Sequence, residues 1–388
     1  MGLPVLEDLP DPHGKVVLVR SDLNVPLRAS VDKGGSSEIA DDFRIMKALP
    51  TLKWLAERGA NVRVCSHLGR PKGKYEMRLS IQPVRERLND LIPGIEVLEN
   101  LRFDPGEESN DPNFVGELIK GCDLFVNDAF GVCHREHASV VGPPSKLPSA
   151  AGRLVAREVE MLSKVVDNPV RPLVVMLGGS KVSDKIGLLR SLVDRTDAVL
   201  IGGGMSFTFL AALGHEVGDS LIDPSHVEFC RDLIDSGRRI MLPVDVRCLS
   251  PEGDLSFSAG GPPGNGTGEV ATHGRTIPKH WRGLDIGPET EALYADEISG
   301  AGTVFWNGPM GVFEDPRFSK GTETVAKSMA KCGGFTVIGG GDSARAIRSI
   351  GLDEEIDHLS SGGGASLQFV ERVALPGLIA LLAAGSTR

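Results

Sequence analysis

LVVMLGGSK, residues 173–181, shows a pattern that recurs along the chain: an apolar, β-branched run ends in glycines and a charged residue. Such runs are typical of strands buried on both faces of a parallel sheet. They alternate with longer amphipathic stretches, which predicts an α/β fold with parallel sheets. The predicted strands are residues 15–20, 61–66, 123–128, 173–177, 198–201, 239–242, 303–306 and 335–338, and the clearest helices are 45–58, 186–195 and 319–331.

The length of 388 residues predicts two domains, because one domain usually has about 100–200 residues. Pro169 and Pro172 end a helical stretch near the middle of the chain, and two domains joined by a helix can bend. We expect an N-terminal domain over residues 1–153, a hinge helix over 154–168 and a C-terminal domain over 169–369. Residues 256–274, which are rich in glycine and proline, predict a long surface loop.

Charge and composition exclude several classes of protein. A net charge of -10 argues against a nucleic-acid-binding surface over the whole molecule. The six cysteines have no CxxC spacing, which favours a reduced cytosolic protein over a disulfide framework or a zinc site. The most apolar stretch, residues 375–384, is far shorter than the roughly 20 residues of a membrane span, and no secretory signal is visible. We therefore expect a cytoplasmic protein without nucleic-acid or membrane partners.

Glycine accounts for 48 of the 388 residues, well above the usual level of about 7%. Runs at 202–204, 339–341 and 362–364 follow apolar stretches, where glycine at a helix start leaves backbone N–H groups open to a phosphate. One such run is more often a tight turn, but several in one predicted domain indicate a phosphate site. Residues 339–344 fit GxGxxA, yet they come too late in the chain for a dinucleotide-binding unit. No Walker or protein-kinase motif is present.

Charged residues beside these runs have two interpretations each. Lys181 and Lys185 are expected on one face of the helix after Gly179, where cations are unfavourable unless an anion is bound; the alternative is two solvated lysines. Asp342 could hold Mg²⁺ on a nucleotide or cap a helix. Glu314 could accept hydrogen bonds from a ribose or be an exposed loop acid.

The first half of the chain carries arginines where the second half carries glycines. A guanidinium pairs with phosphate or carboxylate through a bidentate fork, although any one of these arginines alone would be a surface ion-pair partner. Together they predict a basic cup for a compact anion. The residues of the cup are Arg20, Arg44, Arg70, Arg102 and Arg135, with His67.

Residues 133–137, Cys-His-Arg-Glu-His, hint at a metal site, but no second ligand pair completes it.

Eleven motifs, in order, make the chain resemble the phosphoglycerate kinase family along nearly its whole length. The resemblance implies reversible phosphoryl transfer between 1,3-bisphosphoglycerate with MgADP and 3-phosphoglycerate with MgATP. It also implies two Rossmann-like domains, with residues 370–388 packing back on the first, and we expect a monomer. The motifs are RSDLNVP (20–26), SHLGRP (66–71), ENLRF (99–103), NDAFG (127–131), LGGSKVSDKI (177–186), IGGGMSFTF (201–209), LPVD (242–245), DIGP (285–288), WNGPMGVFE (306–314), GGGDS (339–343) and SSGGGASL (360–367).

The resemblance also implies roles for individual residues. The 3-phosphoglycerate site would contain Asp22, Asn24, Arg44, His67, Arg70, Arg102 and Arg135. The nucleotide site would contain Gly202, Gly203, Lys185, Gly283, Leu284, Asn307, Glu314, Gly340, Gly341, Asp342 and Ser343, with Asp342 as the ligand of Mg²⁺. Arg20 and Lys181, with the backbone of Gly340, Gly341, Gly363 and Gly364, would stabilise the phosphoryl group in transfer. Departures from the family pattern, which are Cys133, Arg153, Ser180 and Gln368, remove none of these residues.

The chemistry suits this set of residues. A carboxylate acceptor is already ionised at pH 7, so no general base is required. The enzyme must instead position two anions and offset charge on the transferring group, which requires Arg, Lys, Mg²⁺ and helix N-termini. Because the two predicted sites lie on different domains, we expect the domains to close for reaction. A phosphate-metabolite sensor that has kept the fold and lost turnover is the alternative hypothesis.

Overall fold

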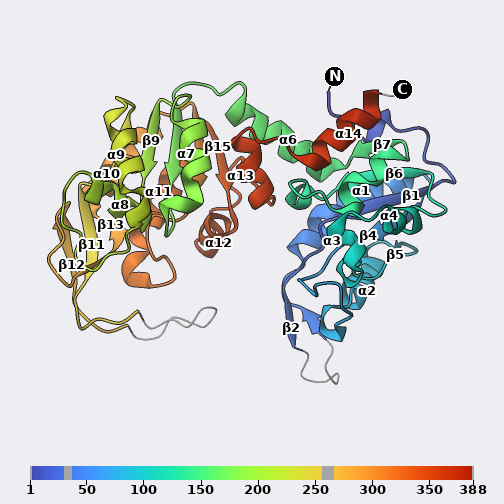
Figure 1. The fold of residues 1–388 in the computed structure, drawn as a ribbon, viewed down its shortest axis with the longest axis horizontal. Coiled ribbons are helices and arrows are strands. Elements are labelled where there is room, and N and C mark those ends of the chain that lie inside the picture. The colour runs from blue at the N-terminus through green and yellow to red at the C-terminus, as the bar shows by residue number, and fades with distance from the viewer. Residues whose placement is uncertain (1, 30–36, 256–265, 387–388) are drawn as a thin grey trace. The chain divides into compact units, whose positions relative to one another are not determined.

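The computed structural model describes residues 2–29, 37–255 and 266–386. The chain divides into two compact units, and each has a parallel sheet flanked by helices (Figure 1). Unit 1 contains Met1–Glu160 and Val373–Arg388, and unit 2 contains Met161–Arg372. The division therefore falls inside α6 (Arg153–Val166). Among the described residues, no helix is both long enough and apolar enough to cross a membrane.

Unit 1 is built on a five-stranded parallel sheet in the order β5-β4-β1-β6-β7. The central strand is buried on both faces, because Val17 and Val19 belong to one hydrophobic cluster and Leu18 to another. A strand covered on both sides does not need alternating polar residues, which is why its apolar run predicted it. The strands of unit 1 are β1 (Val16–Ser21), β4 (Asn61–Cys65), β5 (Glu96–Val97), β6 (Leu124–Asp128) and β7 (Ser149–Ala151), with a separate antiparallel pair, β2 (Leu27–Ala29) and β3 (Ser37–Ile39).

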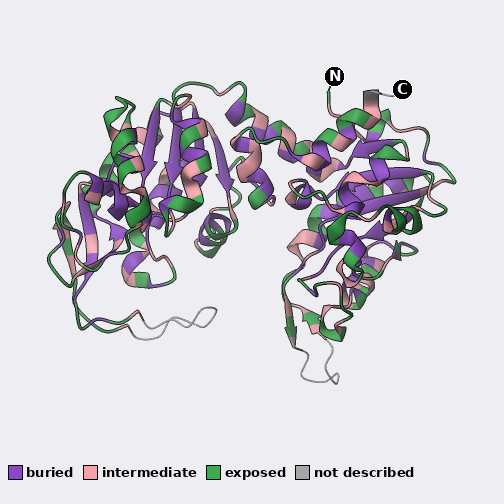
Figure 2. Ribbon diagram, viewed as in Figure 1, coloured by how far each residue is buried: buried purple, intermediate pink, exposed green. Residues whose placement is uncertain are grey.

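Helices cover both faces of this sheet. Ile45 and Leu88 join the cluster of Val17, while Leu118 joins the cluster of Leu18. The last helix, α14, contacts α5, η5 and β7, so the end of the chain belongs to unit 1. Figure 2 shows buried strands and helices with exposed outer faces. The helices of unit 1 are α1 (Phe43–Glu57), α2 (Gln82–Leu91), α3 (Pro105–Ser109), α4 (Pro112–Leu118), α5 (Ala138–Val141) and α14 (Pro376–Ser386), with η1 (Leu6–Asp8), η2 (Met77–Leu79), η3 (Leu101–Phe103), η4 (Phe130–Val132) and η5 (Pro143–Ser145).

Unit 2 has a six-stranded parallel sheet in the order β10-β9-β8-β14-β15-β16 and a three-stranded antiparallel sheet in the order β12-β11-β13. Trp306 and Val174 are fully buried in a cluster with residues of α10, α11 and α12. The strands are β8 (Leu173–Leu177), β9 (Ala198–Ile201), β10 (Ile240–Met241), β11 (Asp245–Leu249), β12 (Val270–Gly274), β13 (Arg282–Ile286), β14 (Thr303–Asn307), β15 (Phe335–Gly339) and β16 (His358–Leu359). The helices are α7 (Ile186–Leu192), α8 (Met205–Ala212), α9 (Val227–Asp235), α10 (Pro288–Ser299), α11 (Lys320–Lys331), α12 (Gly341–Ser349) and α13 (Gly364–Val370), with η6 (Val182–Lys185), η7 (Pro224–His226) and η8 (Pro316–Phe318).

Strand order locates a crevice in each sheet. In unit 1 the chain proceeds from β1 to β4 and β5 on one side, whereas β6 and β7 lie on the other. In unit 2, β9 and β10 follow β8 on one side, and β15 and β16 follow β14 on the other. Loops diverge at such switch points, and ligands bind there beyond the carboxyl ends of the strands. The loops after β1 and β6, and those after β8 and β14, are therefore expected to carry the sites.

The structure confirms the α/β class and corrects two details of the sequence analysis. Residues 270–274, expected within a surface loop, form β12 and pair with β11, while residues 256–265 of that loop lie outside the described part of the chain. The antiparallel sheet of unit 2 was missed because its strands mix polar and apolar residues; β12, for example, alternates between exposed and half-buried positions.

Candidate active site

The carboxyl end of β1 carries a buried arginine. Arg20 has no exposed side-chain surface, and its guanidinium donates hydrogen bonds to the hydroxyl of Ser139, at 2.9 Å, and to the carbonyl of Ser21. Just beyond the strand, Asp22 pairs with Arg44 from the start of α1. The switch point of unit 1 therefore brings together two of the predicted arginines and one predicted acid.

His67 completes this inner group, and its neighbours define its tautomer. Nη2 of Arg20 lies 3.1 Å from Nδ1 of His67. A guanidinium only donates, so Nδ1 must accept, and the ring proton is on Nε2. Burial lowers the pKa of His67 well below its usual value, and the charges of Arg20 and Arg102 lower it further. His67 is thus a neutral ring whose Nε2–H can donate to a ligand.

The outer part of the cluster is held by one loop, residues 67–70. Nη1 of Arg102 donates to the carbonyl of Gly69 at 2.8 Å, and Oδ1 of Asn24 accepts from the N–H of Gly69 at 2.8 Å. The neighbouring Arg70 and, after β6, Arg135 are exposed. The predicted residues of the basic cup are therefore either anchored around β1 or exposed on the loops beside it.

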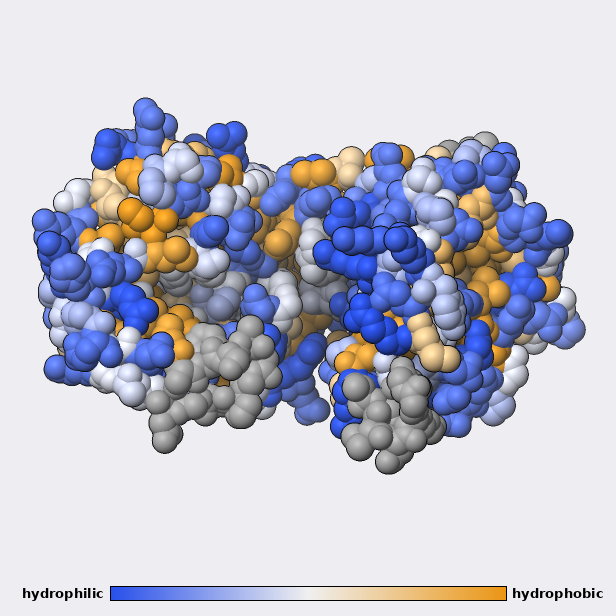
Figure 3. Space-filling model, turned by 60° about the horizontal axis from the view of Figure 1, so that its bottom comes forward, coloured by the Kyte–Doolittle hydropathy of each residue, from blue (hydrophilic) through white to orange (hydrophobic). Residues whose placement is uncertain are grey.

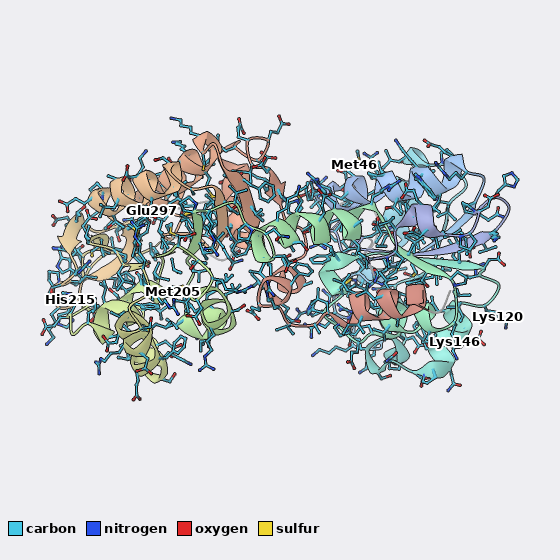
Figure 4. All side chains as sticks on the ribbon, turned by 90° about the horizontal axis from the view of Figure 1, so that it is seen from above. Met46, Lys120, Lys146, Met205, His215 and Glu297 are labelled. Atoms are coloured by element: carbon cyan, nitrogen blue, oxygen red, sulfur yellow. The ribbon has the colours of Figure 1, made fainter. Side chains whose placement is uncertain are left out.

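Burial and the charges of the cluster keep the nearby His137 uncharged. Burial, followed by the charges of Arg102, Arg20 and Arg135, lowers the pKa of His137 to about 4. Cationic groups so closely spaced repel one another, which an anionic ligand would relieve. Not every cation of unit 1 belongs here, because the exposed Lys120 and Lys146 lie at the outer edge of the unit (Figure 4).

The switch point of unit 2 opens into a pocket of about 420 Å³. This volume lies in the usual range of about 300–1,000 Å³ for small-molecule sites. Five of the predicted nucleotide-site residues line it: Gly203, Gly283, Leu284, Glu314 and Asp342. The pocket wall thus contains both apolar and acidic side chains. Figure 3 shows hydrophobic residues reaching the surface of unit 2, the body on the left.

Sequence reasoning missed other residues of this pocket. Pro309, Val312 and Phe313 lie in motif 306–314, of which only Asn307 and Glu314 were assigned roles. Ser220 and Leu221 also line the pocket, but their stretch of sequence carries no motif. An aromatic side chain beside a glycine-rich turn was the available signal for Phe313.

Several of the glycines are required by contacts within the protein. At Gly203, φ is +64°, and a Cβ atom would lie 2.6 Å from the backbone N of Gly179. A Cβ on Gly308, where φ is +94°, would collide with the carbonyl oxygen of Gly178. The loops after β8, β9 and β14 therefore pack backbone to backbone, which only glycine permits. By contrast, the Cβ position of Gly341 faces open space.

Lys181 and Lys185 do not share a helix as the sequence predicted. Lys181 is extended and exposed before η6, and Lys185 ends η6, so α7 begins only at Ile186. The amino group of Lys185 donates to Oδ1 of Asn307, and burial lowers its pKa. The two lysines therefore differ: one is held in the protein, and the other is free to meet a ligand.

Asn307 and Ser343 tie neighbouring loops together. Nδ2 of Asn307 donates to the carbonyl of Gly339 at 2.6 Å, and a Cβ on Gly340 would lie 2.7 Å from this nitrogen. Oγ of Ser343 accepts from the N–H of Gly308 at 2.6 Å. These bonds place the start of α12 beside the end of β14.

The first turn of α12 faces the pocket with an acid and without a side-chain cap. Gly340 is the N-cap, and no side chain of the described residues caps this end. Asp342 is largely exposed and pairs with Arg345 at 3.2 Å, as does Glu314 at 2.8 Å. Free N–H groups at a nine-residue helix suit a phosphate.

The donor set also fits Mg²⁺ on a nucleotide. No group of three or more His, Cys, Asp or Glu within residues 2–29, 37–255 and 266–386 could hold a metal by itself. Magnesium bound with phosphates needs only one or two protein carboxylates, and Asp342 supplies one on the pocket wall.

Not all the predicted residues are brought together. Gly202 lies behind the pocket against Met310, and its N–H donates to Leu177. Gly364 begins α13, and neither it nor Lys181 lines the pocket. Met205, which follows the run 202–204, is fully buried and lies inside unit 2 (Figure 4).

The fold and these two sets of residues define a class of enzyme. A pocket of nucleoside size beside uncapped helix N–H groups, and a cluster of arginines in the other unit, belong to a nucleotide-dependent phosphotransferase. The family follows from comparison with known proteins.

A family model described as phosphoglycerate kinase matches residues 6–97 and 93–372. The phosphoglycerate kinase of Parafrankia sp. is 47% identical over 95% of this chain and 97% of its own length, and that of Salinispora arenicola is 47% identical over 98% and 100%. The structure of phosphoglycerate kinase from Coxiella burnetii matches with a TM-score of 0.88 and 34% identity over 98% of this chain and 99% of that one. The chain belongs to the phosphoglycerate kinase family.

The activity follows from the family. The protein is a phosphoglycerate kinase of glycolysis, a phosphotransferase with a carboxyl group as acceptor. The family, the α/β fold and the reaction expected from the sequence are confirmed. The individual site residues and the domain limits remain predictions.

Proposed function

We propose that unit 1 binds 3-phosphoglycerate and unit 2 binds the magnesium–nucleotide complex. The observation that carries the first assignment is the buried Arg20 with neutral His67 at the end of β1. Arg44, Arg70, Arg102 and Arg135 lie around the same strand end and would bind the phosphate and carboxylate, with Asp22 and Asn24 beside them. A bidentate guanidinium suits both groups.

The pocket of unit 2 supports the nucleotide assignment. Glu314 lines its wall and would accept hydrogen bonds from a ribose, and Gly283 and Leu284, which also line it, would offer an apolar surface to a base. The N–H groups at the start of α12 would meet phosphate oxygens. Asp342, which pairs with Arg345, would hold Mg²⁺, and the metal would supply positive charge against the phosphates when bound.

Arg20 and Lys181 would stabilise the phosphoryl group during transfer. No base is required, because the acceptor carboxylate is ionised at neutral pH. Lys181 is exposed beside the pocket residues Gly179 and Ser180, so its ammonium group is available for this role. Backbone N–H groups of Gly341 and Gly364, both at helix starts, would add to the stabilisation.

Each proposed site is built within one unit of one chain, which supports a monomer as the active form. We propose the cytoplasm as its location, in keeping with a glycolytic enzyme. We also propose α6 as the hinge, because the division between the units falls within it.

The role of Lys181 is tested by Lys181→Ala in a coupled assay with 3-phosphoglycerate, ATP and Mg²⁺. Because the charge acts mainly in the transition state, kcat is expected to fall roughly 10²-fold or more, with KM changing less. Lys327→Ala, at an exposed lysine of α11, is the matched control and keeps normal kinetics. Near-normal kcat in Lys181→Ala would make Lys181 a solvated surface lysine.

A further inference from the structure

A buried acid lies behind Arg20 in unit 1. Glu107, on α3, has no exposed side-chain surface. Both of its oxygens accept hydrogen bonds from Ser139 on α5: the backbone N–H lies 2.9 Å from Oε2, and the hydroxyl lies 2.7 Å from Oε1. Neither residue was among those expected from the sequence, and no step described so far uses Glu107.

The hydroxyl of Ser139 links Glu107 to Arg20. Its oxygen accepts from Nε of Arg20 at 2.9 Å while its proton is donated to Glu107. A hydroxyl has one proton, so the bond to Glu107 leaves only lone pairs for Arg20. The hydrogen bonds therefore run in one direction, from the guanidinium through Ser139 to the carboxylate.

Charge gives a second reason for the arrangement. Arg20 is fully buried, and no carboxylate in the described part of the chain forms a direct ion pair with it. A buried cation is costly unless an anion or hydrogen bonds compensate. Burial raises the pKa of Glu107 above its usual value, and Arg20 and the hydrogen bonds from Ser139 offset part of this rise. Glu107 and Arg20 therefore stabilise each other's charged form through the hydroxyl of Ser139, which lies between them.

We propose that Glu107 is a positioning residue for phosphoryl transfer: through Ser139 it holds the Arg20 guanidinium in one orientation and offsets its charge. Ser21 and His67 accept two of the remaining donors of Arg20, so the group is held on three sides. A preorganised cation stabilises developing charge without reorganising during the reaction. The inference rests on the role proposed above for Arg20.

Glu107→Gln tests this link with almost no change in volume. Ser139 presents two donors to Glu107, and a glutamine amide offers only one oxygen, so one donor would face an NH₂ group. We expect kcat to fall about tenfold, with the KM for 3-phosphoglycerate changing less, because residues in one hydrogen-bond network are energetically coupled.

A double-mutant cycle separates positioning from a general structural role. In the Arg20→Ala background, Glu107→Gln is expected to cause no further loss of kcat, because there is no guanidinium left to position. If the two losses multiply, or if Glu107→Gln alone keeps normal kcat, the proposal is overturned. Normal kcat in Arg20→Ala alone would instead overturn the role of Arg20.

A second variant and a control complete the test. Ser139→Ala removes the link while keeping Glu107 and should reproduce the kcat loss, again only when Arg20 is present; it decides the question if Glu107→Gln does not fold. Glu291→Gln, at a buried acid of unit 2 paired with Arg247, controls for the loss of any buried carboxylate and should keep normal kcat. Normal kcat in folded Ser139→Ala would sink the proposal.

Discussion

Gly308 shows how one residue can be required by packing beside a site. It follows β14 with φ at +94°, and a Cβ would collide with the carbonyl oxygen of Gly178. Gly308→Ala should therefore lower the free energy of unfolding of unit 2 by about 1–3 kcal/mol, measured by urea denaturation.

The control for Gly308 is Gly300, the C-cap that follows α10, which has φ at -89° and no atom within 4 Å of its Cβ position. Gly300→Ala is expected to be neutral or to stabilise by about 0.4–1 kcal/mol, because it restricts only the unfolded chain. Equal midpoints for the two variants would show that the loops around Gly308 move apart at little cost.

At the same scale, the sequence identified charges better than contacts. It singled out Arg20 and His67, because basic residues that follow predicted strands can be recognised from the order of residues alone. It missed Glu107 and Ser139, which are ordinary residue types until the fold places them together. It also put Lys181 and Lys185 on one helix, whereas the bond of Lys185 to Asn307, 122 residues away, accompanies a helix start that is delayed to Ile186.

At the scale of elements, the start of α6 depends on a buried acid of β6. Oδ1 of Asp128 accepts from the N–H of Leu154 at 2.9 Å, and Oγ1 of Thr51 accepts from the N–H of Arg153 at 2.8 Å. These bonds satisfy N–H groups that the first turn of a helix cannot pair internally. Arg153 itself pairs with Glu7, which gives this departure from the family pattern a partner within unit 1.

The same acid predicts a pH dependence of stability. Burial raises the pKa of Asp128 to about 7, whereas an unfolded Asp titrates near 3.9. Between these values the folded protein binds a proton that the unfolded chain has lost, so this group's contribution to stability falls as pH rises from about 4 to about 7. The slope is at most about 1.4 kcal/mol per pH unit.

Asp128→Asn removes this titration. Between pH 5 and pH 7, the free energy of unfolding of the variant should therefore decrease less than that of the unaltered protein, measured by chemical denaturation. Asp123→Asn, at the exposed residue just before β6, is the control and should follow the original pH profile. Parallel curves for Asp128→Asn and the unaltered protein would mean that Asp128 is ionised throughout this range.

At the scale of the whole molecule, the two proposed sites belong to different units, so transfer between them would require the units to close on each other. Closure also excludes water that would hydrolyse ATP. X-ray scattering should show a smaller radius of gyration with 3-phosphoglycerate and MgADP together than with either alone. Unchanged dimensions in a protein with normal turnover would contradict a hinge in α6.

The sequence by itself determined the α/β class, the family and the kinds of residue that we propose for the two substrate sites. Buried parallel strands, glycine-rich turns and the family motifs each consist of residues that are adjacent in the chain. The fold class and the family can therefore be recognised from the sequence. Only the tertiary structure decided the tautomer of His67, the pKa of Asp128 and the link from Glu107 to Arg20. These depend on burial and on contacts between residues up to 119 positions apart, and neither exists until the chain has folded.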